Sequence, residues 1–374
     1  MTLHITDAFD GGNIRVLDAS DPGHVRLEIK KDYQSDFYQW FYFRVTGEAG
    51  TELSLNIENA GGAAFTKGWE NYNAVVSYDQ NDWLRVPSSY DGKTLTITTK
   101  MRRNTLWVAY FAPYTEERHQ ALIAGAQGSN TAQVNVLGET IDGRPLDLIT
   151  IGDPTSDKPV IWVTGRQHPG ESMAEWWMEG FLERLLDITD QMSLKLLEQA
   201  TLYIVPNMNP DGSARGHLRT NAVGTNLNRE WATPSLEKSP EVYFVLYKMR
   251  ETGCKIALDV HGDEAIPYNF IAGAEGITRW NDDMAADLAA FQHAYVQSTG
   301  GVFQTKYGYP LTPPGKANLS ICTNALAQEF GCLAMTLEMP FKDDNNHPNK
   351  DRGWSPMASK QLGANAIEPL LKAL

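Results

Sequence analysis

Residues 160–172 have the sequence VIWVTGRQHPGES, in which an apolar run is followed by a polar loop and the start of a helix. The run at 160–164 is short and rich in β-branched side chains, which is typical of a buried strand. Ser172 and Glu175 have the spacing of a capping box, so we expect a helix from about Met173. A strand that leads directly into a helix is the repeating unit of an α/β domain.

The same alternation of apolar runs and amphipathic segments continues along the rest of the chain. Further strands are expected at 202–205, 256–260 and 333–337, with helices at about 240–253 and 279–297. Continuously apolar strands are typical of a sheet that is buried on both faces. The pattern therefore predicts a mixed, mostly parallel sheet flanked by helices.

The chain before residue 112 has a different pattern, in which short aromatic-rich runs alternate in polarity. Turn-forming clusters such as Gly61-Gly62 separate the runs, and this combination is typical of an antiparallel β-sandwich. The character changes near Pro113, where Thr115 can cap a helix that ends at Gly125. We therefore expect an all-β antiparallel sandwich domain at 1–112 and an α/β domain at 113–374. The strand-like runs of the sandwich lie at 37–45, 52–57, 73–78, 94–98 and 105–111.

The composition is that of a folded acidic protein, since 42% of the 374 residues are hydrophobic and the formal net charge is -14. This charge argues against a nucleic-acid or anionic-membrane surface, which would need clustered Lys and Arg. No run approaches the roughly 20 apolar residues of a membrane span, and residues 1–12 lack a secretory signal pattern. We expect an unexported, cytoplasmic protein, and no oligomeric state is predicted. Three cysteines are too few for a disulfide framework and are expected to be reduced: Cys254, Cys322 and Cys332.

Two histidines and a glutamate are the candidate metal ligands. His168 and Glu171 form an H-x-x-E pair on the loop after the strand at 160–164, although such a pair alone often occurs by chance. His261 follows the strand at 256–260, so all three side chains are expected at the carboxyl edge of the sheet. Two imidazoles and a carboxylate leave a fourth position open, which is typical of one catalytic Zn²⁺ per chain. The alternative for His261 is a histidine satisfied within the core.

Glu338 lies inside the apolar run at 333–340, where burial of a carboxylate is costly unless it serves a purpose. Alternation places it on the same face as Ala334 and Thr336. As a functional residue it would be a general base for a water molecule that the metal activates. The alternative is a structural glutamate paired with a basic side chain.

A locally basic stretch stands out in this acidic chain. Residues 217–229 (HLRTNAVGTNLNR) contain no acidic residue but include Arg219, Asn228 and Arg229. A guanidinium fork binds a carboxylate through two parallel charge-assisted bonds, which a pocket for a free peptide C-terminus requires. The alternative is a solvated loop.

Several of these motifs together resemble the zinc metallocarboxypeptidases, and within them the cytosolic-carboxypeptidase group. The resemblance covers about residue 113 to the C-terminus, and an N-terminal β-sandwich is similar to the architecture of that group. It implies the carboxypeptidase fold and peptide or protein C-terminal tails as substrates. The matching residues, in the order of the family, are His168-Pro169-Gly170-Glu171, Asn209-Pro210-Asp211-Gly212, Asn228-Arg229, His261-Gly262 and Glu338.

The resemblance also implies a role for each matching residue. His168, Glu171 and His261 would bind zinc, while Glu338 would activate water and pass its proton to the leaving amine. Arg219 matches the arginine that polarises the scissile carbonyl and stabilises the developing oxyanion. The pair that grips the terminal carboxylate of the substrate is matched by Asn228 and Arg229.

Two positions depart from the pattern of the family. Asn226 stands where many relatives have an Asp that orients a zinc-ligand imidazole, and its amide oxygen can accept the same bond with less charge. The substrate-capping tyrosine has no single match. Tyr307 and Tyr309 are nearby, whereas simple spacing back from Glu338 leads to about Lys316.

The preferred last residue of the substrate is a further expectation from the resemblance. The cytosolic group is associated with acidic tails, in particular glutamate. Lys306 or Lys316 is a candidate for recognising such a side chain, and Thr323 is a candidate for lining the pocket.

Two other functions are weighed against the carboxypeptidase. One is a zinc-dependent deacylase of small N-acyl amino acids on a related fold, against which the Asn209-Pro210-Asp211-Gly212 motif and the sandwich argue. The other is a non-catalytic protein whose aromatic-rich sandwich binds peptide or glycan, against which the complete ligand set argues. Trp40, Tyr42 and Trp69 are expected in the sandwich core. We expect the sandwich to pack beside the cleft and to limit which tails can enter.

Overall fold

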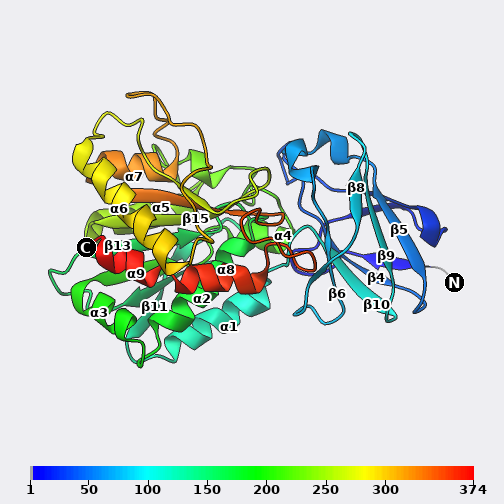
Figure 1. Cartoon of the computed structure of the whole chain (residues 1–374), viewed down its shortest axis with the longest axis horizontal. Helices are drawn as coiled ribbons and strands as arrows, with labels where there is room; N and C mark the ends of the chain where they lie inside the picture. The colour runs from blue at the N-terminus through cyan, green and yellow to red at the C-terminus, as the bar shows by residue number, and fades with distance from the viewer. Residues whose placement is uncertain (1–2) are drawn as a thin grey trace.

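The computed structural model describes residues 3–374 and shows two domains side by side (Figure 1). The N-terminal strands, drawn in blue, form one domain, and the remaining chain forms a larger domain with helices around a sheet. The last strand of the first domain ends at Ala109, and the first long helix begins at Glu116. No helix within residues 3–374 is long and apolar enough to cross a membrane.

Two five-stranded sheets make up the N-terminal domain, as the sequence predicts for a β-sandwich. All strand pairs are antiparallel except β3 with β5, because the chain crosses to the other sheet through β4 before it returns. The sequence did not predict this parallel pair. One sheet has the order β1(His4–Thr6), β4(Tyr42–Thr46), β10(Thr105–Ala109), β6(Val75–Ser77), β7(Leu84–Arg85); the other has β2(Arg15–Asp18), β3(Val25–Glu28), β5(Glu52–Ile57), β9(Leu95–Lys100), β8(Ser88–Tyr90). Short 3-10 helices lie at Pro22–His24, Ala60–Gly62 and Thr66–Trp69.

Aromatic side chains fill the interior of this sandwich. Trp40, Tyr42 and Trp69 are at most 2% exposed, which confirms that they belong to the core. The indole N–H of Trp40 donates to the carbonyl of Gly11 and that of Trp69 to the carbonyl of Ala60, both at 2.9 Å. Burial of these rings therefore leaves no indole donor unsatisfied.

A seven-stranded mixed sheet is the centre of the second domain. Its four middle strands β14, β13, β15 and β17 are parallel, while β11 and β12 on one side and β16 on the other are antiparallel. This arrangement confirms the predicted fold class. The strands, in sheet order, are β11(Ala132–Glu139), β12(Pro145–Ile151), β14(Thr201–Val205), β13(Val160–Gly165), β15(Ile256–Asp263), β17(Leu333–Pro340) and β16(Phe270–Ala272).

Helices cover both faces of this sheet (Figure 1). Side chains on opposite faces belong to two separate buried clusters: Ile161 and Val163 pack with α2, whereas Trp162 packs with α5 and α7. The parallel strands are therefore buried on both faces, as their apolar sequences predict. The helices are α1(Glu116–Gln127), α2(Met173–Leu185), α3(Gln191–Gln199), α4(Pro210–Arg215), α5(Pro240–Thr252), α6(Asp282–Ser298), α7(Cys322–Phe330), α8(Pro356–Ala364) and α9(Ile367–Lys372), with a 3-10 turn at Leu227–Arg229.

Helix α2 begins at Met173 as expected, but the predicted capping box is wrong. The hydroxyl of Ser172 donates to the carbonyl of Ala112 at 2.9 Å and makes no cap bond. Glu175 is turned into the interior, where its carboxylate lies 2.7 Å from Nδ1 of His119. The two side chains thus hold neighbouring segments together instead of satisfying the helix end.

Two other helix boundaries differ from the expectation. α1 continues to Gln127, because Gly125 is accommodated within the helix and the cap is formed at Gly128. α6 begins at Asp282, slightly later than predicted, because the side chain of Asn281 accepts a hydrogen bond from the first turn. Asparagine is a favoured N-cap, and this signal fixes the start of the helix.

Candidate active site

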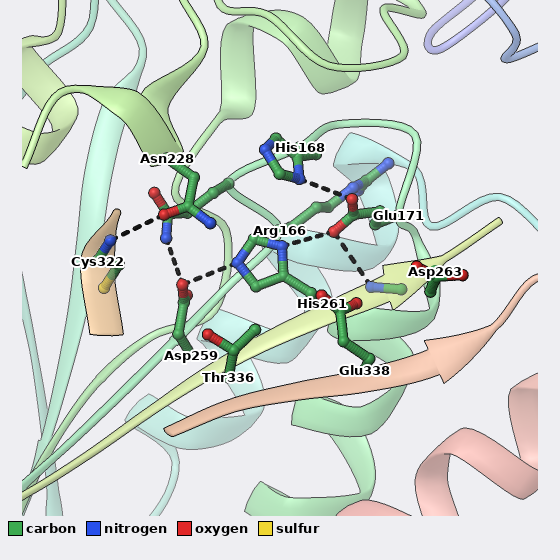
Figure 2. Close-up of polar contacts among 12 residues, drawn as sticks. Arg166, His168, Glu171, Asn228, Asp259, His261, Asp263, Cys322, Thr336 and Glu338 are labelled. Carbon is green, nitrogen blue, oxygen red and sulfur yellow. Dashed lines mark hydrogen bonds and ion pairs between the residues drawn. The ribbon is translucent and has the colours of Figure 1, made fainter. Parts of the chain in front are cut away.

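The three predicted metal ligands lie together at one edge of the sheet (Figure 2). His168 and Glu171 are on the loop between β13 and α2, and His261 is on the neighbouring strand β15. β15 is longer than expected, because pairing with β17 continues as far as Asp263, and His261 lies within its last three residues, at the carboxyl end as predicted. The imidazole is only 1% exposed, yet it lines the same cleft as the other two ligands.

Glu171 lies between the two imidazoles. Its Oε1 is 2.6 Å from Nδ1 of His168, and its Oε2 is 2.7 Å from Nδ1 of His261. One ligand atom from each residue lies within 4.8 Å of the other two. Two imidazole nitrogens and one carboxylate are the donors of a catalytic zinc site, so the residues present fit this metal.

The outer nitrogens of both imidazoles are held by other side chains. Nε2 of His168 is 3.1 Å from Oδ1 of Asn226, and Nε2 of His261 is 2.8 Å from Oδ2 of Asp259. These contacts fix the ring orientations and leave both Nδ1 atoms directed at the metal position. Asn226 therefore makes the contact expected of it, with a neutral amide in place of a carboxylate.

Asp259 was not singled out from the sequence. It lies in the buried run of β15, two residues before His261, so both side chains project from the same face of the strand. The carboxylate also accepts a hydrogen bond from the hydroxyl of Thr164 at 2.8 Å. The signal in the sequence was a charged residue inside an otherwise apolar strand.

Glu338 lies beside the metal ligands on β17. It is paired in register with His261, and its side chain is 6% exposed. One carboxylate oxygen accepts from the hydroxyl of Tyr309 at 3.0 Å, while the other has no partner within the described chain. Burial raises the pKa of Glu338 well above its usual range, and the nearby His261 only partly offsets this effect. Glu338 therefore lines the cleft with one oxygen that is buried and has no protein partner.

Tyr309 is the tyrosine that lies in the cleft at Glu338. Its hydroxyl lies 2.8 Å from Oδ2 of Asp263 and 3.0 Å from Oε1 of Glu338, so its single proton is shared between the two carboxylates. The ring is 45% exposed, and it comes from the long segment between α6 and α7. Sequence spacing could not distinguish it from Tyr307, which lines the same cleft but stacks its ring on Tyr268.

Arg219, Asn228 and Arg229 line the same cleft of about 720 Å³ as the metal ligands and Glu338. The side-chain oxygen of Asn228 accepts from the backbone N–H of Cys322 at 2.9 Å, which fixes the amide. Burial lowers the pKa of Arg229, and the neighbouring charge of Arg219 lowers it further. Two cations are thus held close together at the cleft wall.

Only some of the candidate specificity residues lie in the cleft. Lys306 and Thr323 line the cleft, whereas Lys316 does not contribute to its wall. The hydroxyl of Thr323 is 2.6 Å from that of Thr336, which shares the face of β17 with Glu338 as predicted.

Both the fold and the donor set can be compared with known proteins. Residues 5–111 match the family described as cytosolic carboxypeptidase N-terminal domain, and residues 121–269 match the zinc carboxypeptidase family. A metallo-carboxypeptidase from Burkholderia cenocepacia is 44% identical, with a TM-score of 0.97 over 100% of this chain and 99% of that chain. This chain belongs to the zinc carboxypeptidase family.

Two further relatives resemble this zinc carboxypeptidase. The metallo-carboxypeptidase from Pseudomonas aeruginosa, solved in complex with (2-guanidinoethylmercapto)succinic acid, is 43% identical over 98% of each chain, with a TM-score of 0.95. Cytosolic carboxypeptidase 1 from Mus musculus is 28% identical over 65% of this chain, which spans only 24% of the mouse protein. His168, Glu171 and His261 are the zinc ligands, as in zinc carboxypeptidases, and peptide C-termini are the substrates of this family.

Proposed function

We propose that this zinc carboxypeptidase releases the last residue of a peptide or protein tail, with Glu338 as general base. One observation carries the proposal. A single cleft contains the metal ligands, a buried carboxylate with a free oxygen, and two adjacent guanidinium groups. The groups needed to bind a carboxylate and to activate water therefore face the same substrate volume.

The two arginines supply the site for the free carboxylate of the substrate. Arg219 is near enough for its charge to lower the pKa of Arg229, and no carboxylate of the described chain forms an ion pair with either guanidinium. An anion between them would relieve this repulsion and accept charge-assisted hydrogen bonds. Asn228, with its oxygen already occupied, can present its amide N–H groups to the same carboxylate.

The chemistry divides between the metal and the side chains of the chain. Zinc, when bound, polarises the scissile carbonyl and lowers the pKa of the attacking water. Glu338 takes the proton of that water on its unpartnered oxygen and delivers it to the leaving nitrogen. Arg219 donates hydrogen bonds to the carbonyl oxygen as negative charge develops there.

Paired substrates test this proposal. A short peptide with a free C-terminal acid should lose its last residue, and chelation should stop the reaction until zinc is restored. The matching C-terminal amide should have a kcat/KM about 10²-fold lower, because a charge-assisted contact is lost. Arg229→Ala should abolish the difference between acid and amide. Equal rates on acid and amide with the unmodified enzyme, or faster cleavage of an N-acyl amino acid, would contradict the assignment.

The finer proposal concerns the side chain of the last residue. Lys306 lines the cleft, and we infer that it favours acidic C-termini, glutamate in particular. Its ammonium lies 5.1 Å from the ring centroid of Tyr307, within the range of cation–π attraction. Lys316 is also exposed but lies outside the cleft lining, so it supplies a matched control.

Peptides that differ only in a terminal Glu, Leu or Lys test the preference. The terminal Glu should give the highest kcat/KM, and Lys306→Gln should reduce this advantage about 3- to 10-fold. Lys316→Gln should leave it unchanged. A higher kcat/KM for Leu or Lys would rule out the acidic preference while leaving the reaction class intact.

The cytoplasmic location is proposed from the match of residues 5–111 to the cytosolic carboxypeptidase N-terminal domain. Fractionation of the native host, followed by immunodetection, would test it. Recovery of the protein from the medium or the envelope would contradict this location.

A further inference from the structure

The segment that carries Arg219 is held by a carboxylate of the other domain. Asp32, in the loop between β3 and β4, is only 3% exposed. Its Oδ1 accepts from the backbone N–H of Leu218 at 2.7 Å. Its Oδ2 accepts from the N–H of Arg219 at 2.8 Å, and from the N–H and hydroxyl of Thr220 at 2.9 and 3.0 Å. One side chain thus satisfies three consecutive backbone donors.

Three successive amides can point at one carboxylate only in a particular local conformation. The dihedral angles of residues 218–220 are therefore coupled to the position of Asp32. A second contact closes the same turn. The backbone N–H of Tyr33 donates to Nε2 of His217 at 3.1 Å, so Nδ1 carries the proton and donates to the carbonyl of Thr220 at 2.9 Å.

The side chain of Arg219 also rests on the N-terminal domain. Its guanidinium carbon lies 5.6 Å from the ring centroid of Phe37 and 5.2 Å from that of Phe65. Both contacts are within the range of cation–π attraction. Phe65 and Arg219 both line the cleft, so the contact between ring and guanidinium lies at the cleft itself.

We propose that Asp32 is a positioning residue for the reaction, acting through residues 218–220 to place Arg219. The N-terminal domain then completes the active site, because it supplies the support of the arginine and one residue of the cleft lining, Phe65. This inference rests on the proposed role of Arg219 at the scissile carbonyl. A guanidinium that is already in place when negative charge develops on the carbonyl oxygen does not have to reorganise. A small displacement of Arg219 should therefore lower kcat.

A double-mutant cycle in the full-length, zinc-loaded enzyme tests this coupling. Asp32→Asn keeps the shape of the side chain but turns one acceptor into a donor that faces the backbone N–H groups. We expect kcat to fall about 10-fold and KM to change less than about 2-fold. Arg219→Ala alone should lower kcat about 10²-fold or more. In the Arg219→Ala variant, Asp32→Asn should lower kcat less than about 2-fold further, because the arginine through which Asp32 acts is already absent.

Zinc content and thermal unfolding are measured on every variant. Arg85→Gln is the control for loss of a contact between the domains, since Nη1 of Arg85 lies 3.2 Å from Oδ2 of Asp343. It should lower the melting temperature without changing kcat.

Phe37→Leu is a second variant for the support of Arg219. It leaves the hydrogen bonds of Asp32 in place and removes a ring next to the guanidinium, so it tests the same support if Asp32→Asn does not fold. It should lower kcat about 2- to 5-fold, and only when Arg219 is present.

The outcomes separate the inference from its premise. Equal losses from Asp32→Asn with and without Arg219, or an unchanged kcat in Asp32→Asn and Phe37→Leu, would overturn the positioning role. An unchanged kcat in Arg219→Ala would instead remove the proposed function of Arg219 itself. Loss of activity that parallels loss of zinc would likewise overturn the inference, since Asp32 would then act on the fold as a whole.

Discussion

Oδ2 of Asp259 lies 2.8 Å from Nε2 of His261 and holds this zinc ligand from the side away from Glu171. Because such contacts orient the ring and raise its basicity, we expect Asp259→Asn to weaken zinc binding about 10- to 100-fold. Competition with a chromophoric chelator would measure the change.

At the other zinc-ligand imidazole, that of His168, the opposite change can be made, from an amide to a carboxylate. Asn226→Asp places a carboxylate at Nε2 of His168 and should strengthen zinc binding. Asp82→Asn, at the exposed ion pair with Arg352, is the control and should have no effect. Unchanged affinity in Asp259→Asn and Asn226→Asp would show that these contacts do not tune the metal.

Glu338→Gln should separate metal binding from turnover. The amide keeps the shape of the side chain but cannot accept the proton of water, so kcat should fall about 10²- to 10⁴-fold. Elemental analysis should still find one zinc per chain, because Glu338 is not a ligand. Retention of more than a tenth of the activity would exclude Glu338 as the base.

Stability should depend on pH through His119. This imidazole is buried between Glu175 and Asp147, at 2.7 and 3.2 Å. Burial alone would lower the pKa of His119, but hydrogen bonds to these two carboxylates raise it to about 10. The folded pKa exceeds that of the unfolded chain, about 6.5. The stabilisation is therefore complete below about pH 6.5 and is lost as pH rises to about 10.

Urea unfolding at several pH values, with excess zinc throughout, measures this contribution. His119 should account for a decline of up to about 1.4 kcal/mol per pH unit within that window. His119→Gln should be less stable at pH 6 and should lack this part of the decline. His293→Gln, on the exposed face of α6, should retain it. The same pH profile in wild type and His119→Gln would refute the prediction.

Gly180 permits close approach of α2 and α8. A Cβ at this position would lie 2.0 Å from the carbonyl oxygen of Lys360, so Gly180→Ala should destabilise the fold by about 1–3 kcal/mol. Gly125→Ala is the matched control, because nothing lies within 4 Å of its Cβ and Gly125 is inside α1. It should stabilise by about 0.5–1 kcal/mol in chemical denaturation. An unchanged free energy of unfolding in Gly180→Ala would mean that α2 and α8 can move apart without destabilising the fold.

The zinc ligands could be predicted because each is marked by local sequence. A polar residue at the end of an apolar run is visible in one dimension, and the parallel sheet brings such ends together. His168, Glu171 and His261 needed no knowledge of distant packing beyond this rule. Glu338 was visible for a related reason, as a carboxylate inside an apolar strand.

The rest of the site depends on contacts that have no local pattern. Asp32 meets residues 218–220 across more than 180 positions of sequence. Tyr309 lies on a segment without regular structure, where spacing predicts no direction for a side chain. Ser172 and Glu175 show the opposite case, because their spacing predicted the correct helix start while both side chains serve other contacts.

The pairing of His261 with Glu338 on adjacent strands fixes the distance between a zinc ligand and the proposed base. The interval between neighbouring strands is about 4.8 Å, a dimension that the peptide backbone determines and side chains scarcely alter. Tyr309 and Lys306, by contrast, come from an irregular segment, and such segments in general tolerate insertion and replacement better than strands do. If the proposed roles hold, new segments grafted between α6 and α7 should change the tail preference while the spacing between His261 and Glu338 is preserved.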